Sequence, residues 1–106
     1  MINNLQGDSV KYLVIPRRQV KKKEFPLLKS SHKWNKFKRI VSVLKRNPKS
    51  RLFYGEKLYS DPPMYSMRID SRNRVIYKIV PKLIPQSHLI GVVKIYEVWG
   101  HYKNWP

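Results

Sequence analysis

Apolar residues follow two different periods along this chain, and these periods predict its strands and helices. The segment "VKYLVIP" (10–16) is rich in β-branched and aromatic residues and ends at a proline, which predicts a first strand. Further along, "SSHKWNKFKRIVSVLKRNP" (30–48) places apolar residues at the spacing of one helix face, which we interpret as a core-packing stripe. The stripe consists of Trp34, Phe37, Val41 and Leu44. We expect this helix to be capped by Ser30 or Ser31 and to end at the Asn-Pro pair.

The segments on either side of this helix complete the set of elements. Residues 17–32 contain many helix formers and Pro26, so we expect a helix there that ends or kinks near Phe25. "RLFYGEKL" (51–58) is typical of a strand interrupted by a glycine, and the "YSDPPM" that follows is a loop because consecutive prolines do not fit inside a paired strand. "HLIGVVKIYEVWGHY" (88–102) is apolar at both alternating positions, which predicts a central strand buried on both faces.

The order of these elements predicts the fold class. A strand, two helices and then several strands joined by short turns are typical of an α+β domain. We therefore expect two amino-terminal helices packed on a small, mainly antiparallel β-sheet. The chain has 106 residues, 42% of them hydrophobic, which is enough for one core. A single domain is predicted over residues 10–106, after a flexible tail at residues 1–9.

The segment "SMRIDSRNRVIY" (66–77) has the alternation of a β-hairpin and contains three arginines. The apolar residues of its two strands share a face only if the loop has an odd number of residues. A three-residue loop (71–73) satisfies this condition and places Met67 opposite Tyr77. Asn73, at the end of the loop, would then adopt the left-handed conformation that such a loop commonly needs.

The same register gathers cations on the opposite face of the hairpin. Arg68, Arg74 and Lys78 would share this face, and Asp70 would lie across from Arg74 and hold it in place. The planar fork of arginine suits the oxygens of a phosphate better than an ammonium group does. From spacing alone, a phosphate-binding platform and a merely solvated basic face are equally good explanations.

The overall charge favours a polyanionic partner. The chain has 23 Lys and Arg against 6 Asp and Glu, a formal net charge of +17. Such a surface favours nucleic acid first, then an acidic protein, then anionic lipid. The absence of cysteine excludes disulfides and thiolate metal sites and agrees with a reducing cytosol. No apolar run approaches the ~20 residues that span a bilayer, so neither a membrane span nor a signal peptide is expected.

RNA cleavage is a reaction that such a platform could support. The 2′-hydroxyl of RNA is itself the nucleophile, so a protein supplies a base, cations for the phosphorane and an acid for the departing 5′-oxygen. This needs neither a metal nor a cofactor, and the scattered acids and histidines predict no metal site. Candidates for base and acid are Glu56, in "YGEKL", and His101, in "WGHY". An isolated glutamate and a histidine near a terminus are usually surface groups, as we expect for His32 and His88, so the residues alone leave both roles open.

The hairpin and the His-Tyr pair that follows it resemble the YoeB (Txe) branch of the RelE/ParE toxin superfamily, whose members carry an "SRRI…NRLVY" hairpin and end in His-Tyr. The matching positions are Arg68-Ile69, Asn73-Arg74, Tyr77 and His101-Tyr102. The resemblance covers residues 10–102 in element order and implies a RelE-like, microbial-ribonuclease-type fold. These proteins are toxins of type II toxin–antitoxin modules: ribosome-dependent mRNA endonucleases (mRNA interferases) that cut the message in the decoding site.

The resemblance implies a role for each matching residue. Glu56 corresponds to the general base, His101 to the general acid and Arg74 to the arginine that stabilises transition-state charge. Arg68 corresponds to the arginine that holds the substrate phosphate, and Tyr102 to a residue that shapes the carboxy-terminal pocket.

Three segments depart from the pattern of this branch, one of them the unusual loop "SDPPMY" (60–65). The customary "GKPEPLK" is replaced by "YGEKLYS", so Tyr59 occupies the place of a lysine; either Lys57 replaces that lysine or the contact is lost. The chain also continues with "KNWP" (103–106), which would crowd the active site or tighten the contact with RNA. The residues expected to bind substrate are Arg68, Lys57, Lys78 and Tyr102.

Two other functions remain as alternatives. A ParE-like toxin that poisons DNA gyrase shares the fold, although that branch generally lacks the base, arginine and histidine set. A non-catalytic basic protein that binds RNA or the ribosome explains the charge equally well. For the nuclease, the resemblance implies a bacterial cytoplasmic protein that acts on ribosome-bound mRNA and is restrained by an acidic antitoxin, which folds over the basic face. It implies no membrane partner, and both a homodimer and a toxin–antitoxin hetero-oligomer are open.

Overall fold

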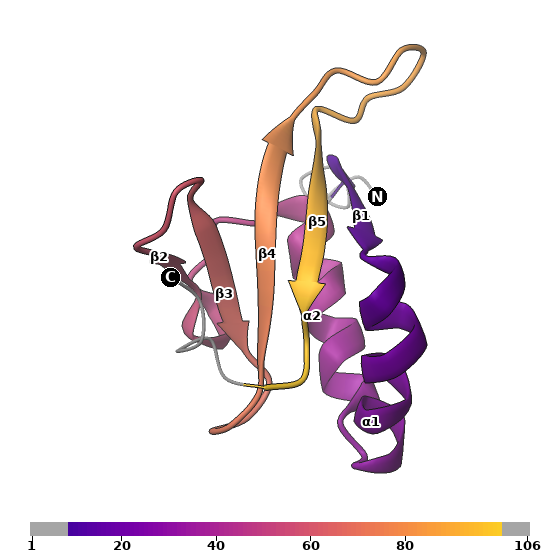
Figure 1. Cartoon of the computed structure of the whole chain (residues 1–106). Helices are drawn as coiled ribbons and strands as arrows, with labels where there is room; N and C mark the ends of the chain where they lie inside the picture. Colours follow the sequence, from indigo (N-terminus) through magenta and orange to yellow (C-terminus); the bar gives the residue numbers. More distant parts are fainter. Residues whose placement is uncertain (1–8, 101–106) are drawn as a thin grey trace, which may run out of the picture.

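The protein folds into a five-stranded sheet with helices on one of its faces (Figure 1). The computed structural model describes residues 9–100. In chain order the elements are β1 (Tyr12–Pro16), a π-helical turn (Val20–Glu24), α1 (Phe25–Ser30), α2 (Trp34–Arg46), a 3₁₀ turn (Leu52–Tyr54), β2 (Glu56–Leu58), β3 (Met64–Arg68), β4 (Arg74–Pro81) and β5 (Gly91–Glu97). The predicted α+β class is confirmed, but the helices are not the amino-terminal elements because β1 precedes them. None of the helices in the described range is long and apolar enough to cross a bilayer.

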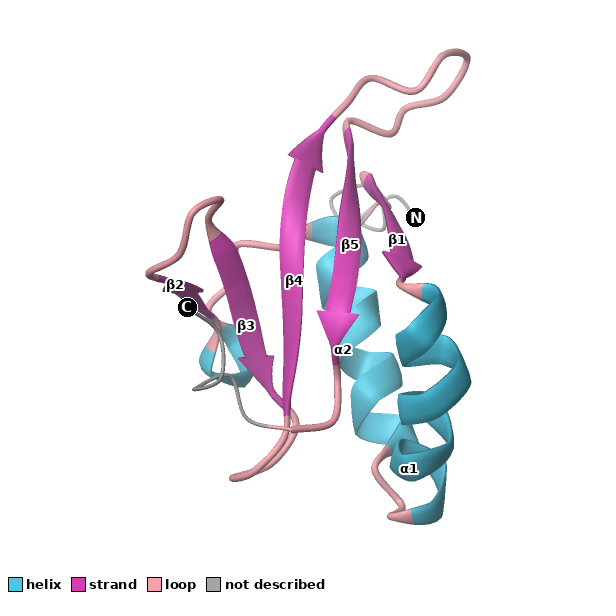
Figure 2. Ribbon diagram, in the orientation of Figure 1, coloured by secondary structure: helices cyan, strands magenta, loops and turns pink. Residues whose placement is uncertain are grey.

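The sheet joins the beginning of the described chain to its end. Its strand order is β1-β5-β4-β3-β2, in which β1 runs parallel to β5 and all other neighbours are antiparallel. A parallel pair cannot be joined by a tight turn. The chain therefore leaves β1 through the helices, which lie on one face of the sheet, before it builds the remaining strands (Figure 2). The sheet is mainly antiparallel, as predicted.

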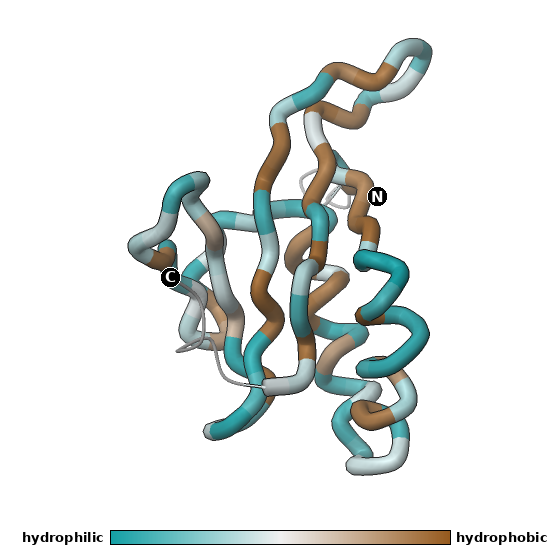
Figure 3. The backbone as a smooth tube through the Cα atoms, viewed as in Figure 1, coloured by the Kyte–Doolittle hydropathy of each residue, from teal (hydrophilic) through white to brown (hydrophobic). Residues whose placement is uncertain are grey.

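The main core lies between α2 and the sheet. The helix buries Phe37, Ile40 and Leu44, and these residues belong to one cluster with buried side chains of the sheet. The buried residues of β3, β4 and β5 in that cluster are Met67, Val75, Tyr77, Val93 and Ile95. Apolar stretches along β4, β5 and α2 are brown in Figure 3. The apolar stripe predicted on the helix is therefore confirmed as a core-packing surface.

The helical backbone continues through Pro26 instead of ending before it. Pro26 is the second residue of α1 and has no N–H to donate, and the last hydrogen bond of the preceding turn runs from the Phe25 N–H to the carbonyl oxygen of Val20. The wider π-helical turn at Val20–Glu24 precedes it, so the helix changes type at Phe25. The predicted irregularity is at the predicted place, but it is a change of helical type and not a break.

The two serines after α1 do not cap α2. The hydroxyls of Ser30 and Ser31 both donate hydrogen bonds to the carbonyl oxygen of Leu27, at 3.2 and 2.8 Å, and so stabilise the end of α1. α2 begins after Lys33 without a side-chain cap. The cap prediction was wrong because the serines satisfy carbonyls of the preceding helix.

The β3–β4 hairpin keeps the predicted faces but not the predicted register. Met67 lies opposite Val75 instead of Tyr77, and Arg68 lies opposite Arg74. The loop is therefore 69–73, longer than predicted. A shift of two residues leaves every side chain on its original face, because the side-chain period of a strand is two.

Hydrogen bonds within the loop explain this register. Asp70 does not lie across from Arg74; its Oδ1 accepts hydrogen bonds from the backbone N–H groups of Arg72 and Asn73, each at 2.8 Å. The Asn73 carbonyl accepts from the N–H groups of Ile69 and Asp70, so these residues close the turn instead of extending the strands. Asn73 is not among the residues with positive φ, so the left-handed conformation predicted for it is wrong.

β5 is an interior strand with only one fully buried face. Val93 and Ile95 are buried beneath the helices, whereas Lys94, between them, is exposed. The expectation of burial on both faces was wrong because no helix within residues 9–100 covers the second face.

Candidate active site

The face of the sheet away from the helices, called the open face below, carries most of the residues predicted to act on RNA. Tyr65, Met67, Val75 and Tyr77 point toward the helices and belong to or pack on the main core. The alternate positions of the same strands point to the open face. Strand pairing therefore brings together Glu56 of β2, Ser66 and Arg68 of β3, and Arg74 and Lys78 of β4.

Arg68 and Arg74 form a directly opposed pair of like charges. Arg74 is 9% exposed, and Arg68 is partly buried with its guanidinium carbon 4.4 Å from the centre of the Tyr54 ring. The buried Nε of Arg68 has no hydrogen-bond partner within residues 9–100. Opposed like charges destabilise a sheet, and burial strengthens the repulsion. A phosphate between the two guanidinium groups would remove this repulsion and could accept a hydrogen bond from the Nε of Arg68.

Glu56 lies on the next strand beside this pair. It is exposed and is paired with Ser66, two residues before Arg68, so Glu56 and Arg68 are diagonal neighbours with their Cα atoms roughly 7–8 Å apart. Glu56 is the first residue of β2 and follows Gly55, where a Cβ would collide with the carbonyl oxygen of Ser50. Glycine therefore allows the close turn that delivers the carboxylate to this edge of the open face.

A second pair of like charges extends the basic surface along β4. Lys78 lies directly opposite Lys94 of β5, roughly 13 Å along the strand from Arg74 at the usual rise per residue. The centre of the half-buried Tyr96 ring lies 5.7 Å from the ammonium of Lys94 and 5.0 Å from the guanidinium carbon of Arg17. Four residues predicted to act on RNA thus share one continuous face: Glu56, Arg68, Arg74 and Lys78.

Lys57 is not brought to this face. It alternates with Glu56 along β2 and pairs with Tyr65, whose side chain packs on the main core. Its side chain therefore leaves β2 on the helix side of the sheet. The structure does not bring Lys57 together with the open-face cations, whereas Arg17 and Lys94, which we did not predict, lie on or beside them.

The segment that leads into His101 is fixed beside Arg74. The N–H of Gly100 donates to Oδ1 of Asn73 at 2.9 Å, and the N–H of Arg74 donates to the carbonyl oxygen of Gly100 at 3.3 Å. Gly100 has φ +125°, a conformation that favours glycine, so the expected bend is confirmed. His101 and Tyr102 themselves lie outside the described residues.

Asp70 stabilises the loop that holds this segment. Burial disfavours its charged form, but hydrogen bonds from Arg72 and Asn73 and the ammonium of Lys33, at 3.7 Å, outweigh burial and lower the pKa of Asp70. Asp70 therefore carries a charge at neutral pH that orients Asn73, and Asn73 in turn holds Gly100.

Glu24 has a similar positioning role that the sequence did not reveal. Its Oε1 accepts hydrogen bonds from the N–H groups of Val98 and Trp99, at 2.8 and 2.9 Å. The carboxylate thus anchors the chain just after β5 to the first helical segment. The partners are 74 and 75 residues apart, so no local pattern in the sequence could have indicated the contact.

The remaining histidines and acids suggest no further centre. His32 and His88 are exposed in turns, which agrees with the expected surface role. Within residues 9–100, no group of three or more histidine, aspartate or glutamate side chains could hold a metal ion.

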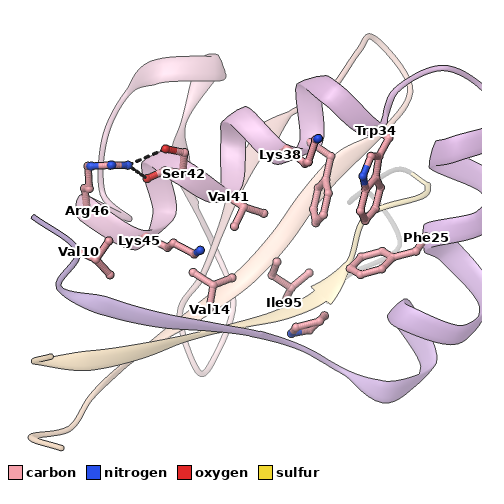
Figure 4. Close-up of a pocket in the computed structure, with 12 residues that line it drawn as sticks. Val10, Val14, Phe25, Trp34, Lys38, Val41, Ser42, Lys45, Arg46 and Ile95 are labelled. Atoms are coloured by element: carbon pink, nitrogen blue, oxygen red, sulfur yellow. Dashed lines mark hydrogen bonds between the residues drawn. The ribbon is translucent and has the colours of Figure 1, made fainter. Parts of the chain in front are cut away.

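A separate apolar groove lies on the helix side, between β1 and the helices (Figure 4). Its volume is about 450 Å³. The apolar lining includes Val14, Phe25, Trp34, Phe37, Val41 and Ile95. Three exposed cations, Lys38, Lys45 and Arg46, also line it. Because β1 is an edge strand of the described sheet, this groove borders a strand edge that no strand within residues 9–100 pairs with, and none of the open-face residues line it.

Comparison with known proteins identifies the fold. No protein-family model and no curated protein sequence matches the chain. Among solved structures, a YoeB/ParE toxin from Agrobacterium tumefaciens is 18% identical, with a TM-score of 0.65 over 85% of this chain and 99% of that one. A YoeB dimer from Staphylococcus aureus is 19% identical, with a TM-score of 0.66 over 87% of this chain and 99% of that one. A YoeB–YefM complex from the same organism gives 0.62 at the same identity and coverage.

The chain has the YoeB fold. The similar structures are spanned almost completely by residues of this chain, so the likeness concerns the whole domain. The fold that we inferred from the hairpin and the His-Tyr pair is thereby confirmed. In the YoeB fold of this chain, the hairpin arginines and the end of the described chain converge at one edge of the open face.

Proposed function

We propose that the protein is the toxin of a type II toxin–antitoxin module and that it cleaves mRNA on the ribosome in the bacterial cytoplasm. The observation that carries this proposal is the position of Glu56, Arg68 and Arg74 on one face of three neighbouring strands. The segment that leads into His101 is hydrogen-bonded to the first residue of β4 at the same edge. A base, a phosphate-binding pair and an acid are the groups that cleavage by the 2′-hydroxyl requires.

In the proposed reaction, each residue acts on a different atom of the RNA backbone. The Glu56 carboxylate accepts the proton of the 2′-hydroxyl, whose oxygen attacks the adjacent phosphorus. Arg74 and Arg68 stabilise the negative charge that develops on the phosphorane oxygens. His101, in its imidazolium form, donates a proton to the 5′-oxygen as the P–O5′ bond breaks. The products are a 2′,3′-cyclic phosphate and a 5′-hydroxyl, formed without metal or cofactor.

The opposed arginines support this assignment better than they support a structural role. Their repulsion destabilises the sheet, while the phosphorane carries more negative charge than the ground-state phosphodiester. Interactions that strengthen as charge develops lower the barrier to reaction. The pair is therefore suited to a transition state with an additional negative charge.

Cleavage by purified protein on translating ribosomes tests the proposal, with the ends of the transcript mapped. Arg74→Ala and His101→Gln are each expected to lower the rate of cleavage by about 10²-fold or more. Arg72→Ala is the matched control, because Arg72 is an exposed residue of the 69–73 loop and its replacement removes the same charge. Its rate should remain close to that of the wild type.

Each of the following results would contradict this proposal. Near-normal cleavage by both Arg74→Ala and His101→Gln would refute the assigned roles. A requirement for added divalent metal, or 3′-hydroxyl ends, would refute the mechanism. Ribosome binding without any cleavage would favour the non-catalytic RNA-binding alternative, and inhibition of DNA gyrase without RNA cleavage would favour the ParE-like alternative.

The proposed antitoxin partner has a suitable surface in the apolar groove beside β1. A short segment with apolar side chains could enter the groove, and acidic residues on that segment would face Lys38, Lys45 and Arg46. The edge of β1 is available for strand addition. Val41→Lys should weaken restraint by the proposed acidic antitoxin, measured as growth on co-expression, while cleavage by the toxin alone stays unchanged. Equal restraint of the variant and the wild type would exclude this docking surface.

A further inference from the structure

Two consecutive residues before β2, Phe53 and Tyr54, have a left-handed backbone. Their φ angles are 56° and 55°, and neither residue is glycine. Large aromatic side chains rarely adopt this conformation, because their Cβ atoms crowd the following carbonyl group. Such strain persists only where surrounding contacts enforce it, and it occurs preferentially at functional sites. The turn therefore needs both a structural and a functional explanation.

Contacts of Phe53 and Gly55 explain how the strain is held. The Phe53 ring is partly buried against the main core and lies 5.9 Å from the ammonium of Lys36. The N–H of Gly55 donates to the carbonyl oxygens of Arg51 and Leu52, at 3.2 and 3.0 Å, and closes the turn. With Phe53 directed inward and the turn closed, the side chain of the next residue is directed out of the core.

Tyr54 is consequently held as an exposed ring at the candidate active site. It is 72% exposed, unlike the buried tyrosine of the core. The guanidinium carbon of Arg68 lies 4.4 Å from its ring centre, and Tyr54 precedes Glu56 by two residues. One side of the ring is thus occupied by the predicted phosphate-binding arginine, while most of the side chain remains accessible.

We propose that Tyr54 is the platform on which a base of the single-stranded RNA substrate stacks. This inference rests on the proposed function, in that the RNA is the strand whose phosphate Arg68 binds. Exposed aromatic rings beside cations are the usual means by which proteins hold unpaired bases, and such stacking tolerates all four bases. Stacking next to Arg68 would fix the nucleotide while Glu56 meets its 2′-hydroxyl. Tyr54 is therefore a positioning and substrate-binding residue.

A fluorescent oligoribonucleotide tests this contact directly. The probe is a short single-stranded RNA with 2-aminopurine, whose fluorescence is quenched by stacking, placed in turn on either side of the reactive phosphate. A 2′-deoxyribose at the cleavage position prevents cleavage. At one of these positions we expect quenching by the wild type and by Tyr54→Phe, and loss of most of this quenching with about 10-fold weaker binding for Tyr54→Ala. Tyr59→Ala is the matched control, since Tyr59 is a fully exposed tyrosine just after β2. This variant should bind the RNA probe with the same affinity as the wild type.

Tyr54→Gly separates stacking from a structural role. Glycine adopts positive φ without strain, so this variant should unfold at the same temperature as the wild type or higher, yet bind as weakly as Tyr54→Ala. A tyrosine that served only the fold would instead lower the unfolding temperature when replaced by glycine. That result, or quenching and affinity equal to wild type in Tyr54→Ala, would overturn the inference.

The outcomes also distinguish this inference from the proposed nuclease function. Quenching that depends on Tyr54 without cleavage of the all-ribose RNA on ribosomes would support the platform and refute the nuclease. Cleavage that is unaffected by Tyr54→Ala, together with unchanged quenching, would refute the platform and leave the nuclease intact.

Discussion

The helix-covered face and the open face of the sheet alternate along the same strands, but they differ in packing and charge. The covered face contains the main core and the helices packed on it. On the open face, the described residues form a small cluster, in which Leu58, Met64 and Ile76 are buried and Tyr96 packs against them. Around that cluster lie two directly opposed pairs of like charges. Burial of apolar surface stabilises the first face, whereas opposed charges destabilise the second.

This difference shows how a small domain can separate stability from binding. A strand directs alternate side chains to opposite faces, so each strand contributes to both tasks without compromise between neighbouring residues. Met67 and Arg68 are adjacent in β3, for example, and one is fully buried in the core while the other belongs to the candidate active site. The core on one face supplies the stability that allows unfavourable charge pairs on the other.

Deletion of equal apolar volume from the two faces is expected to give the largest contrast. Ile95 of β5 is 1% exposed on the covered face, and Ile95→Ala should lower the free energy of unfolding by about 2–5 kcal/mol. Leu13 of β1 is 44% exposed on the open face, and Leu13→Ala should cost less than about 1 kcal/mol. Denaturant unfolding measures both, and equal losses would contradict the division of labour between the faces.

The buried hydroxyl of Tyr77 gives the next largest effect. It donates to the carbonyl oxygen of Pro48 at 2.6 Å, so Tyr77→Phe should leave a buried acceptor unpaired and cost about 1–3 kcal/mol. Burial, together with the nearby Tyr65, raises the pKa of Tyr77 above its ordinary value of 10.0. Stability from this group is therefore full below pH 10 and falls as the pH rises further, because the unfolded chain loses the proton first. Unfolding experiments at alkaline pH should show a weaker decline for Tyr77→Phe; an unchanged decline would indicate another group.

The Asp70 carboxylate is expected to have a smaller effect, on the acid side. Its pKa is lowered in the folded protein, so its contribution is present above the ordinary value of 3.8 and is lost as the pH falls toward the folded-state pKa. Asp70→Asn should be about 1 kcal/mol less stable than the wild type at neutral pH. As the pH falls from about 5 to about 2, the variant should lose about 1 kcal/mol less of its free energy of unfolding than the wild type does. Thermal unfolding across this pH range measures the difference. An equal fall in unfolding temperature for the two proteins as the pH decreases would disprove it.

Relief of charge repulsion on the open face gives the smallest effect and has the opposite sign. Lys94→Met removes one of two opposed lysines and should raise the free energy of unfolding by about 0.2–1 kcal/mol at low salt. The gain should disappear near about 1 M salt, where charges are screened within roughly 3 Å. Affinity for single-stranded RNA should fall in the same variant. A loss of stability at low salt would show that the pair is held by contacts that favour the fold.

Local patterns predicted those features of the fold that depend on side-chain period. The stripe on α2 and the two faces of the hairpin were correct, and the faces survived an error in register because the error was two residues. The register itself depended on hydrogen bonds inside the 69–73 loop, where Asp70 and Asn73 close the turn. Loop length could not be read from alternation, since every odd length preserves the faces.

The candidate site was predicted in part. Arg68, Arg74 and Lys78 were found from alternation within one hairpin, and Glu56 shares their face through the pairing of β2 with β3. Lys57 was also predicted to bind substrate, but β2 directs its side chain to the helix side, because one step along a strand reverses the side-chain direction. Tyr54 gave no signal in the sequence, because its exposure follows from backbone angles that a tyrosine rarely adopts.

The sequence by itself determined the class of fold, the basic surface and the sorting of residues between two faces, since composition and period act over a few neighbouring residues. Only the tertiary structure decided which strands are neighbours, how β1 pairs with β5 across nearly the whole chain, and how Glu24 and Asn73 fix the segment before His101. These contacts join residues far apart in the chain. Their formation depends on the loop-closure entropy and packing of the complete domain, which no local pattern records.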